Sequence, residues 1–196
     1  MKAVIYDYET LSNVPAEAPV VAMSMFRFDS DRFTTNPYTL EEIVAQAGFF
    51  KFDIAEQVKE LGRVINQETL DWWMEQDKDV REAMLNPKPD DLSIRDLPTI
   101  FKRFYQENDL VFTRGNTFDP IITDFMLKAM GENPYVHPFF VVRDTRSFIE
   151  GMSWGSDLKN SFTPPELEGK SIDKHDPRVD IALDVLRIQT LAQAIS

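Results

Sequence analysis

Carboxylates are the residues of this sequence whose types and spacing point most directly to chemistry. Asp7 and Glu9 lie two residues apart in a strand-like segment, so the period of a strand places both side chains on one face. Two adjacent carboxylates repel each other unless a cation lies between them. A solvated Asp-x-Glu pair at the end of a strand is the ordinary alternative. Because the flanking residues are apolar, the pair instead indicates a site for a divalent cation.

A second acidic position, Asp119, lies in the segment Arg-Gly-Asn-Thr-Phe-Asp-Pro at 114–120, directly after an apolar run at 109–113. Asp119 followed by Pro120 is typical of the N-cap and first residue of a helix, which is a purely structural role. The same junction between a strand and a helix lies at the carboxyl edge of a sheet, where sites form in α/β proteins. The sequence leaves both interpretations open.

The third segment, His-Asp-Pro-Arg-Val-Asp, begins at His175. Asp176 and Pro177 again resemble an N-cap and a first helical residue, which would leave His175 on a loop just before the helix. Asp180 then falls in the first helical turn, and Asp184 lies one turn further along as a rival or auxiliary ligand. The ordinary alternative is a loop histidine and an acid that favours the positive end of the helix dipole.

Composition narrows the kinds of site that the chain can build. The sequence has 196 residues, a formal net charge of −12, no cysteine and two histidines, His137 and His175. Zinc–thiolate sites, iron–sulfur clusters, disulfides and cysteine nucleophiles are therefore excluded. A strongly acidic chain that acts on a phosphodiester must recruit cations first. The N-terminus does not read as a signal peptide, and no segment is a membrane span, so we expect a soluble, cytoplasmic protein.

The apolar patterns predict one α/β domain over residues 1–196, with a mixed sheet. A polar, proline-interrupted stretch at 153–174 predicts a long loop. The predicted strands are 3–8, 18–28, 49–53, 109–113 and 138–142, the first two forming a hairpin, and the predicted helices are 67–76, 77–85, about 93–107, 120–130 and 177–194.

Three motifs span nearly the whole chain in a fixed order. They are Asp7-Tyr-Glu9-Thr10, Asn116-Thr-Phe118-Asp119, and His175 with Asp180. This ordered set resembles that of the DEDDh exonucleases, the DnaQ-like branch of the ribonuclease H-like superfamily. The resemblance implies a ribonuclease H-like fold, in which a mixed central sheet, antiparallel and then parallel, is flanked by helices.

Shorter segments between these motifs carry a closer resemblance. They are Lys51-Phe52-Asp53, Thr69-Leu-Asp-Trp72-Trp73, Arg114-Gly115 and His175-Asp176. These segments look like those of the exonuclease A group of T-even bacteriophages and of the bacterial ribonuclease AS group. The phage group implies DNA as substrate and the bacterial group implies RNA, so both substrates stay open. Residues 29–48 and 153–174 match neither group.

The resemblance implies a metal-dependent 3′–5′ exonuclease that releases nucleoside 5′-monophosphates from single-stranded DNA or RNA. Asp7, Glu9, Asp119 and Asp180 would hold two Mg²⁺ or Mn²⁺ ions, which clamp the attacking and leaving oxygens. His175 would accept the proton of the attacking water. A homodimer is compatible with the resemblance, and no membrane partner is implied.

Several other residues are expected to contact the substrate. The resemblance implies that Thr10 and Leu11 lie beside the terminal nucleotide, with the Thr10 backbone at the sugar and Leu11 wedged against a base. Trp72 and Trp73 point about 100° apart on a helix, so one is expected in the core and the other is free to stack on a base, although both could be core. Further candidates are Asn116 and Phe118 of the second motif, and Arg114, Arg143 and Arg146, which could contact phosphate and for each of which a solvated arginine is the ordinary alternative.

Three other functions remain as alternatives. A ribonuclease H-like module could bind nucleic acid or a partner without catalysis. An endonuclease on the same fold would cut internally. A structural calcium site is the third, and His175 disfavours it because histidine is a poor calcium ligand.

Overall fold

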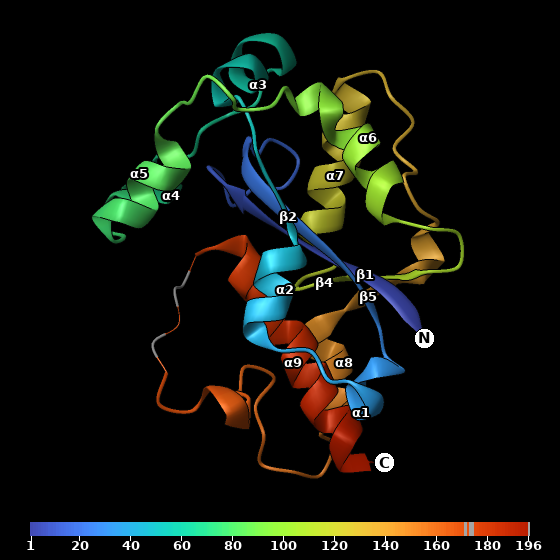
Figure 1. Ribbon diagram of the computed structural model, residues 1–196. Coiled ribbons are helices and arrows are strands. Elements are labelled where there is room, and N and C mark those ends of the chain that lie inside the picture. The colour runs from blue at the N-terminus through green and yellow to red at the C-terminus, as the bar shows by residue number, and fades with distance from the viewer. Residues whose placement is uncertain (171, 173–174, 196) are drawn as a thin grey trace.

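The computed structural model describes residues 1–170, 172 and 175–195. Strands and helices alternate along the described chain, and Figure 1 shows helices on both sides of a central sheet. In chain order the elements are β1 (Lys2–Thr10), β2 (Val20–Asp29), α1 (Arg32–Thr35), α2 (Leu40–Gln46), β3 (Gly48–Lys51), α3 (Ile54–Leu61), α4 (Gln67–Met74), α5 (Lys78–Leu85), η1 (Ile94–Asp96), α6 (Leu97–Phe104), β4 (Leu110–Thr113), α7 (Asp119–Ala129), η2 (Phe139–Val141), β5 (Val142–Asp144), α8 (Thr145–Met152), η3 (Pro165–Leu167) and α9 (Pro177–Ile195).

The central sheet has the strand order β3-β2-β1-β4-β5. β1 and β2 pair antiparallel, as does β3 with β2, whereas β4 pairs parallel to β1 and β5 parallel to β4. The sheet is therefore antiparallel on one side of β1 and parallel on the other, which confirms the predicted α/β class with its mixed sheet. β1 lies in the centre, so the acidic motif that it carries is surrounded by other elements.

The two faces of β1 pack against different helices. Tyr6 and Tyr8 belong to a core cluster with residues of α6 and α7, whereas Ile5 belongs to a cluster with residues of α9. Because side chains alternate along a strand, Asp7 and Glu9 project on the same face as Ile5. The sequence of β1 thus directs both carboxylates toward α9, the helix that carries Asp180.

A third cluster fixes α4 and α5 beside the end of β1. Trp73 of α4 and Met84 of α5 pack on Leu11 and Val21. Asn66 caps α4 by accepting the Thr69 N–H at 2.9 Å. The two helices therefore lie where the strand that carries Asp7 and Glu9 ends.

The predicted helices at 67–76, 77–85, 120–130 and 177–194 are confirmed as α4, α5, α7 and α9. The helix predicted over 93–107 differs from the structure. Ser93 does cap its start, with Oγ accepting the Arg95 N–H at 3.1 Å, but the cap opens a 3₁₀ turn. α6 follows from Leu97 and ends at Phe104, so the helical segment is shorter than its pattern indicates.

The prediction of a buried strand at 138–142 is wrong. Pro138 precedes a 3₁₀ turn over Phe139–Val141, and β5 begins only at Val142. Phe139 is 81% exposed and Phe140 66% exposed, so the run is apolar without being buried. Composition alone does not separate a buried strand from an aromatic surface turn. The shift places the edge strand β5 next to the second motif.

Four helices lie where the sequence analysis predicted none: α1, α2, α3 and α8. Capping signals for three of them are present in the sequence. Thr39 accepts the Glu42 N–H at 3.1 Å at the start of α2. Asp53 accepts the Glu56 N–H at 3.1 Å at the start of α3, and Asp144 accepts the Ser147 N–H at 2.8 Å at the start of α8.

The loop predicted at 153–174 contains the short turn η3, and its residues 171, 173 and 174 lie outside the described part of the chain. None of the helices in the described residues combines the length and the apolarity that crossing a membrane requires.

Candidate metal centre and active site

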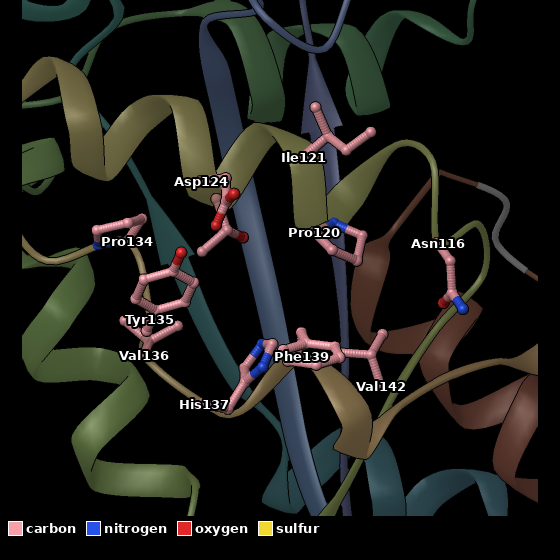
Figure 2. Close-up of a pocket in the computed structure, with 11 residues that line it drawn as sticks. Asn116, Pro120, Ile121, Asp124, Pro134, Tyr135, Val136, His137, Phe139 and Val142 are labelled. Carbon is pink, nitrogen blue, oxygen red and sulfur yellow. The ribbon is translucent and has the colours of Figure 1, made fainter.

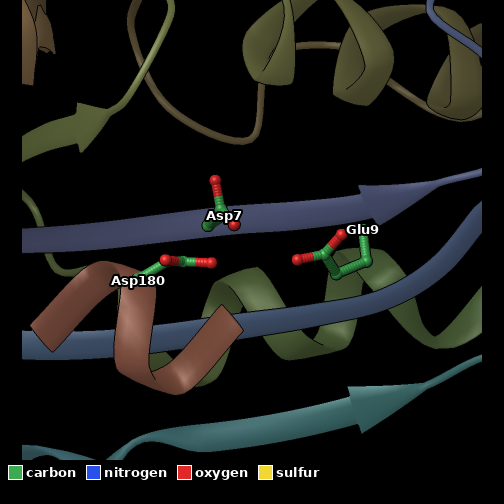
Figure 3. Close-up of side chains that lie close together, drawn as sticks. All are labelled: Asp7, Glu9 and Asp180. Atoms are coloured by element: carbon green, nitrogen blue, oxygen red, sulfur yellow. The ribbon is translucent and has the colours of Figure 1, made fainter. Parts of the chain in front are cut away.

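Three carboxylates converge between β1 and α9. Asp7, Glu9 and Asp180 each offer an oxygen atom, and these atoms all lie within 4.8 Å of one another. In Figure 3 the carboxylates of Glu9 and Asp180 point toward each other, with Asp7 beside them. Residues 173 positions apart in the chain thus meet because β1 and α9 pack face to face. The structure brings together three of the four acids that the motifs predicted as ligands.

The fourth acid, Asp119, is fastened to the same strand from the other side. Its Oδ1 accepts the backbone N–H of Tyr8 at 3.2 Å, and the residue is 3% exposed. Of the two interpretations of Asp119, its role as the N-cap of α7 is wrong. Phe118 occupies the N-cap position, and Asp119 is the first helical residue. The shift of one residue releases the carboxylate from capping and directs it toward the backbone between Asp7 and Glu9.

Burial and the charges of nearby acids raise the pKa of all four acids. Burial, together with the charges of the neighbouring acids, raises the pKa of Asp7 and of Glu9 well above the ordinary range. Burial raises the pKa of Asp119 to about 7, although the Tyr8 N–H opposes the change. Burial and then the charge of Asp184 raise the pKa of Asp180 to about 6. Four acids that resist ionisation together form a site that a cation would stabilise.

These shifts predict how the stability of the metal-free protein depends on pH. The pKa of Asp119 is about 7 in the folded protein, against roughly 3.9 in an unfolded chain. Between these values the folded state binds more protons, so the free energy of unfolding falls as pH rises. We expect the Tm in EDTA to be lower at pH 8 than at pH 5.

Asp119→Asn should reduce this pH dependence, by at most about 4 kcal/mol, because one buried charge is removed. Thermal unfolding followed by circular dichroism measures the effect. Asp90→Asn, at an exposed acid outside the site, is the matched control and should keep the full dependence. A Tm that rises from pH 5 to pH 8 in EDTA would show that the site is not electrostatically strained.

Asp184, which the sequence offered as an auxiliary ligand, has a different role in the structure. Its carboxylate accepts hydrogen bonds from Arg114, from Arg187 at 2.8 Å and from the Thr145 hydroxyl at 2.5 Å. The group of oxygens that lie close together within the described residues does not include Asp184. Asp184 is therefore the anchor of a buried ion-pair network beneath Asp180.

His175 lies just before α9, as the sequence predicted. Asp176 caps the helix by accepting the Arg178 N–H at 2.9 Å, and Pro177 is its first residue. His175 has a left-handed backbone (φ +67°), which is uncommon outside glycine. Its ring packs edge-to-face on Trp72, with centroids 4.9 Å apart. The imidazole thus packs against Trp72, which lines a pocket beside Glu9, and it also lines a separate groove next to α5.

That pocket, of about 240 Å³, lies directly beside Glu9. Of the predicted substrate residues, Thr10, Trp72, Trp73 and Phe118 line it. Trp72 is 40% exposed, whereas Trp73 is 1% exposed and donates its Nε1–H to the Thr10 carbonyl at 2.9 Å. The structure therefore resolves which tryptophan is core and which faces the pocket.

Leu11 and Asn116 do not join this pocket. Leu11 is 3% exposed and packs with Trp73 in the third core cluster, so it does not present a wedge to a base. Asn116 lies at the edge of another hollow, of about 280 Å³, between α7 and residues 134–142. Figure 2 shows Asn116 at one side of this hollow, with Tyr135, His137 and Phe139 gathered at the other.

The three candidate arginines differ in what their side chains contact. Arg114 pairs with Asp184 and also reaches the side chain of Asn160. Arg143 donates to the carbonyls of Phe140 and Val142. Arg146 is exposed, and its charge lowers the pKa of Asp119. Arg146 is therefore the arginine of the three that is electrostatically linked to the acids and open to solvent.

Sequence reasoning missed the groups that support these acids. Arg187 and Thr145 hold Asp184, and the backbone N–H of Tyr8 holds Asp119. The spacing of Asp184 and Arg187, three residues apart on a helix, is a readable signal for an ion pair. The Thr145 contact spans 39 residues and left no signal in the local pattern.

Comparison with models of protein families shows which family the chain resembles over most of its length. Residues 2–176 match the model of the Rv2179c-like family, described as the 3′–5′ exoribonuclease Rv2179c-like domain. The chain belongs to this family. This Rv2179c-like chain therefore carries a 3′–5′ exoribonuclease domain, which confirms the predicted class of enzyme. A comparison with curated proteins gave no match.

Solved structures of exonuclease I share the fold of this Rv2179c-like chain. The E. coli enzyme in complex with a dA16 oligonucleotide matches with a TM-score of 0.66 and 12% identity, covering 98% of this chain and 41% of that one. Exonuclease I from Methylocaldum szegediense matches with a TM-score of 0.65 and 14% identity, covering 98% and 40%. A zinc-bound complex of E. coli exonuclease I with single-stranded DNA matches with a TM-score of 0.58 and 14% identity, covering 98% and 39%. The chain thus spans about two fifths of the length of the structures it matches, and these likenesses show a shared fold.

Proposed function

We propose that this Rv2179c-like domain hydrolyses single-stranded RNA from the 3′ end and releases nucleoside 5′-monophosphates. The observation that carries the proposal is the convergence of Asp7, Glu9 and Asp180 within 4.8 Å, beside a pocket lined by aromatic side chains. Family membership supports an exoribonuclease as the activity. The pocket, at about 240 Å³, is smaller than the ~300–1,000 Å³ typical of larger ligands, which suits one nucleotide.

The donor set fits Mg²⁺ or Mn²⁺. Asp7, Glu9 and Asp180 offer only carboxylate oxygens, which hard divalent cations prefer, and the charge of the nearby Asp119 raises the pKa of Asp7. We propose that these four acids hold two such cations. When bound, the cations lower the pKa of water and stabilise the charge of the leaving oxygen.

The residues of the chain perform the remaining tasks of the mechanism. His175, just before α9, accepts the proton of the attacking water. The Tyr8 N–H holds the Asp119 carboxylate in place. Trp72 and Phe118 form walls of the pocket that receives the terminal nucleotide.

Digestion of labelled single-stranded RNA and DNA of one sequence, side by side, tests the choice of substrate. We expect RNA to be degraded faster in Mg²⁺, and both reactions to stop in EDTA. Faster degradation of DNA would overturn the RNA assignment. Binding without cleavage in Mg²⁺ would favour the alternative of a ribonuclease H-like binding module.

Blunt duplexes should be degraded more slowly than single strands of equal length. The chain has a net charge of −12, and Arg114 and Arg143 already bond to groups of the protein itself. A duplex end must also be unpaired before a nucleotide can enter an aromatic pocket. Initial rates on matched RNA substrates measure the preference, with a frayed 3′ end as an intermediate case. Equal or faster degradation of the blunt duplex would contradict it.

A further inference from the structure

Trp72 connects the nucleotide pocket with His175. Its side chain lines the pocket of about 240 Å³ that Glu9 and Thr10 also line. It also contacts the ring of His175, which lines a groove of about 920 Å³ together with residues of α5. The two rings are nearly perpendicular, with an interplanar angle of 89° and centroids 4.9 Å apart. One aromatic side chain thus touches both the nucleotide pocket and the histidine of the third motif.

The position of Trp72 relative to the acids is fixed by its neighbour. Trp73 is buried and bonds to the carbonyl of Thr10, the last residue of β1. The rings of Trp72 and Trp73 pack at 5.2 Å and 77°. Because β1 also carries Asp7 and Glu9, α4 holds the Trp72 ring at a set place beside the acid cluster.

The start of α9 fixes the backbone of His175 but does not fix the direction of its imidazole ring. The residue precedes the Asp176 cap and has a left-handed backbone, so the start of the helix determines where its Cα lies. The direction of the imidazole depends on the side-chain torsions and on what packs against the ring. Trp72 at 4.9 Å and Trp73 at 6.4 Å provide aromatic surfaces for this packing. Edge-to-face aromatic pairs of this kind have a preferred geometry.

We propose that Trp72 is a positioning residue for His175, in addition to forming the wall of the nucleotide pocket. Its indole ring holds the imidazole in the direction from which it serves the acid cluster. This inference rests on the proposed function for its kinetic consequence, but the packing itself can be tested without catalysis. Loss of the ring should reduce kcat through His175 and raise KM through the nucleotide.

Magnetic resonance of the metal-free protein tests the packing directly. The chain has two histidines, so the imidazole region contains two sets of signals, and His137→Ala assigns them. We expect Trp72→Leu to move the His175 signals toward those of an unstacked imidazole, while the His137 signals stay in place as an internal reference. Unchanged His175 signals would overturn the proposal.

A double-mutant cycle separates the two roles of Trp72. Trp72→Leu should lower kcat about tenfold, within the range of coupled side chains, and should raise KM. In a His175→Ala background the same change should leave kcat unaltered and still raise KM. Trp72→Phe, which keeps an aromatic surface, should retain most of kcat. An equal loss of kcat in both backgrounds would show that Trp72 acts on the structure of the site as a whole.

Met74→Ala, at an exposed position on the same helix, is the matched control and should behave as the wild type in both measurements. The magnetic resonance and the kinetic measurements also separate this inference from the proposed function. A wild-type protein that does not hydrolyse RNA contradicts the proposed function, while the imidazole signals still decide the packing.

Discussion

Asp119→Asn is expected to abolish turnover while leaving the fold intact. Asparagine keeps an oxygen that accepts the Tyr8 N–H, so the contact that holds this side chain survives. What is lost is one negative charge from the set proposed to hold the cations. Because bound cations contribute several kcal/mol to the transition state, we expect the rate to fall on the order of 10³-fold or more. Single-turnover hydrolysis of labelled RNA at saturating Mg²⁺ measures the loss.

The matched control lies on the same helix. Asp124→Asn removes a carboxylate that pairs with Lys128 at 3.4 Å on the exposed side of α7. We expect this variant to keep the wild-type rate and Asp7→Asn to lose it as Asp119→Asn does. A near-wild-type rate for Asp119→Asn would mean that Asp119 supports the structure and not the chemistry.

His175→Ala is expected to lower kcat by about 10²–10⁴-fold with little change in the affinity for metal or substrate, the contribution typical of a positioned general base. The wild-type rate should rise with pH through the histidine range of about 6–7, and the variant should lose that rise. Saturating Mg²⁺ is required, because Asp119, with a pKa of about 7 in the metal-free protein, titrates in the same window.

His137→Ala provides the comparison, since burial lowers the pKa of His137 and its ring packs near Phe101 and Tyr105, away from the acids. This variant should keep both kcat and the rise with pH. If the two histidine variants behave alike, or if the rise persists in His175→Ala, another group accepts the proton.

The acids of the site were predictable because their spacing follows the periods of strands and helices. Asp7 and Glu9 share a face by the period of two, and Asp180 falls in the first turn of α9 behind a proline. The sequence identified Asp119 as the acid at the start of a helix, but its interpretation as the N-cap is off by one residue, because Asp119 is the first helical residue. The difference between a cap and a first helical residue depends on the backbone angles of Phe118, which the pattern Asp-Pro does not encode.

Contacts between distant segments account for most of what the sequence left out. The pairing of Asp184 with Arg114 joins residues 70 positions apart, and the packing of His175 on Trp72 joins α4 to the start of α9. Neither contact has a local signature. The prediction for residues 138–142 was wrong for another reason. The aromatic residues of this segment are exposed at the surface, whereas their hydropathy predicts that they are buried in the core.

The most direct test of the central claim is digestion of one single-stranded RNA carrying a label at its 5′ end or, in a parallel reaction, at its 3′ end. In Mg²⁺ the account predicts stepwise shortening of the 5′-labelled strand and immediate release of the 3′ label as a nucleoside 5′-monophosphate, with no reaction in EDTA. Internal fragments that retain an intact 3′ end, or cleavage that continues undiminished in EDTA, would contradict a metal-dependent 3′–5′ exonuclease.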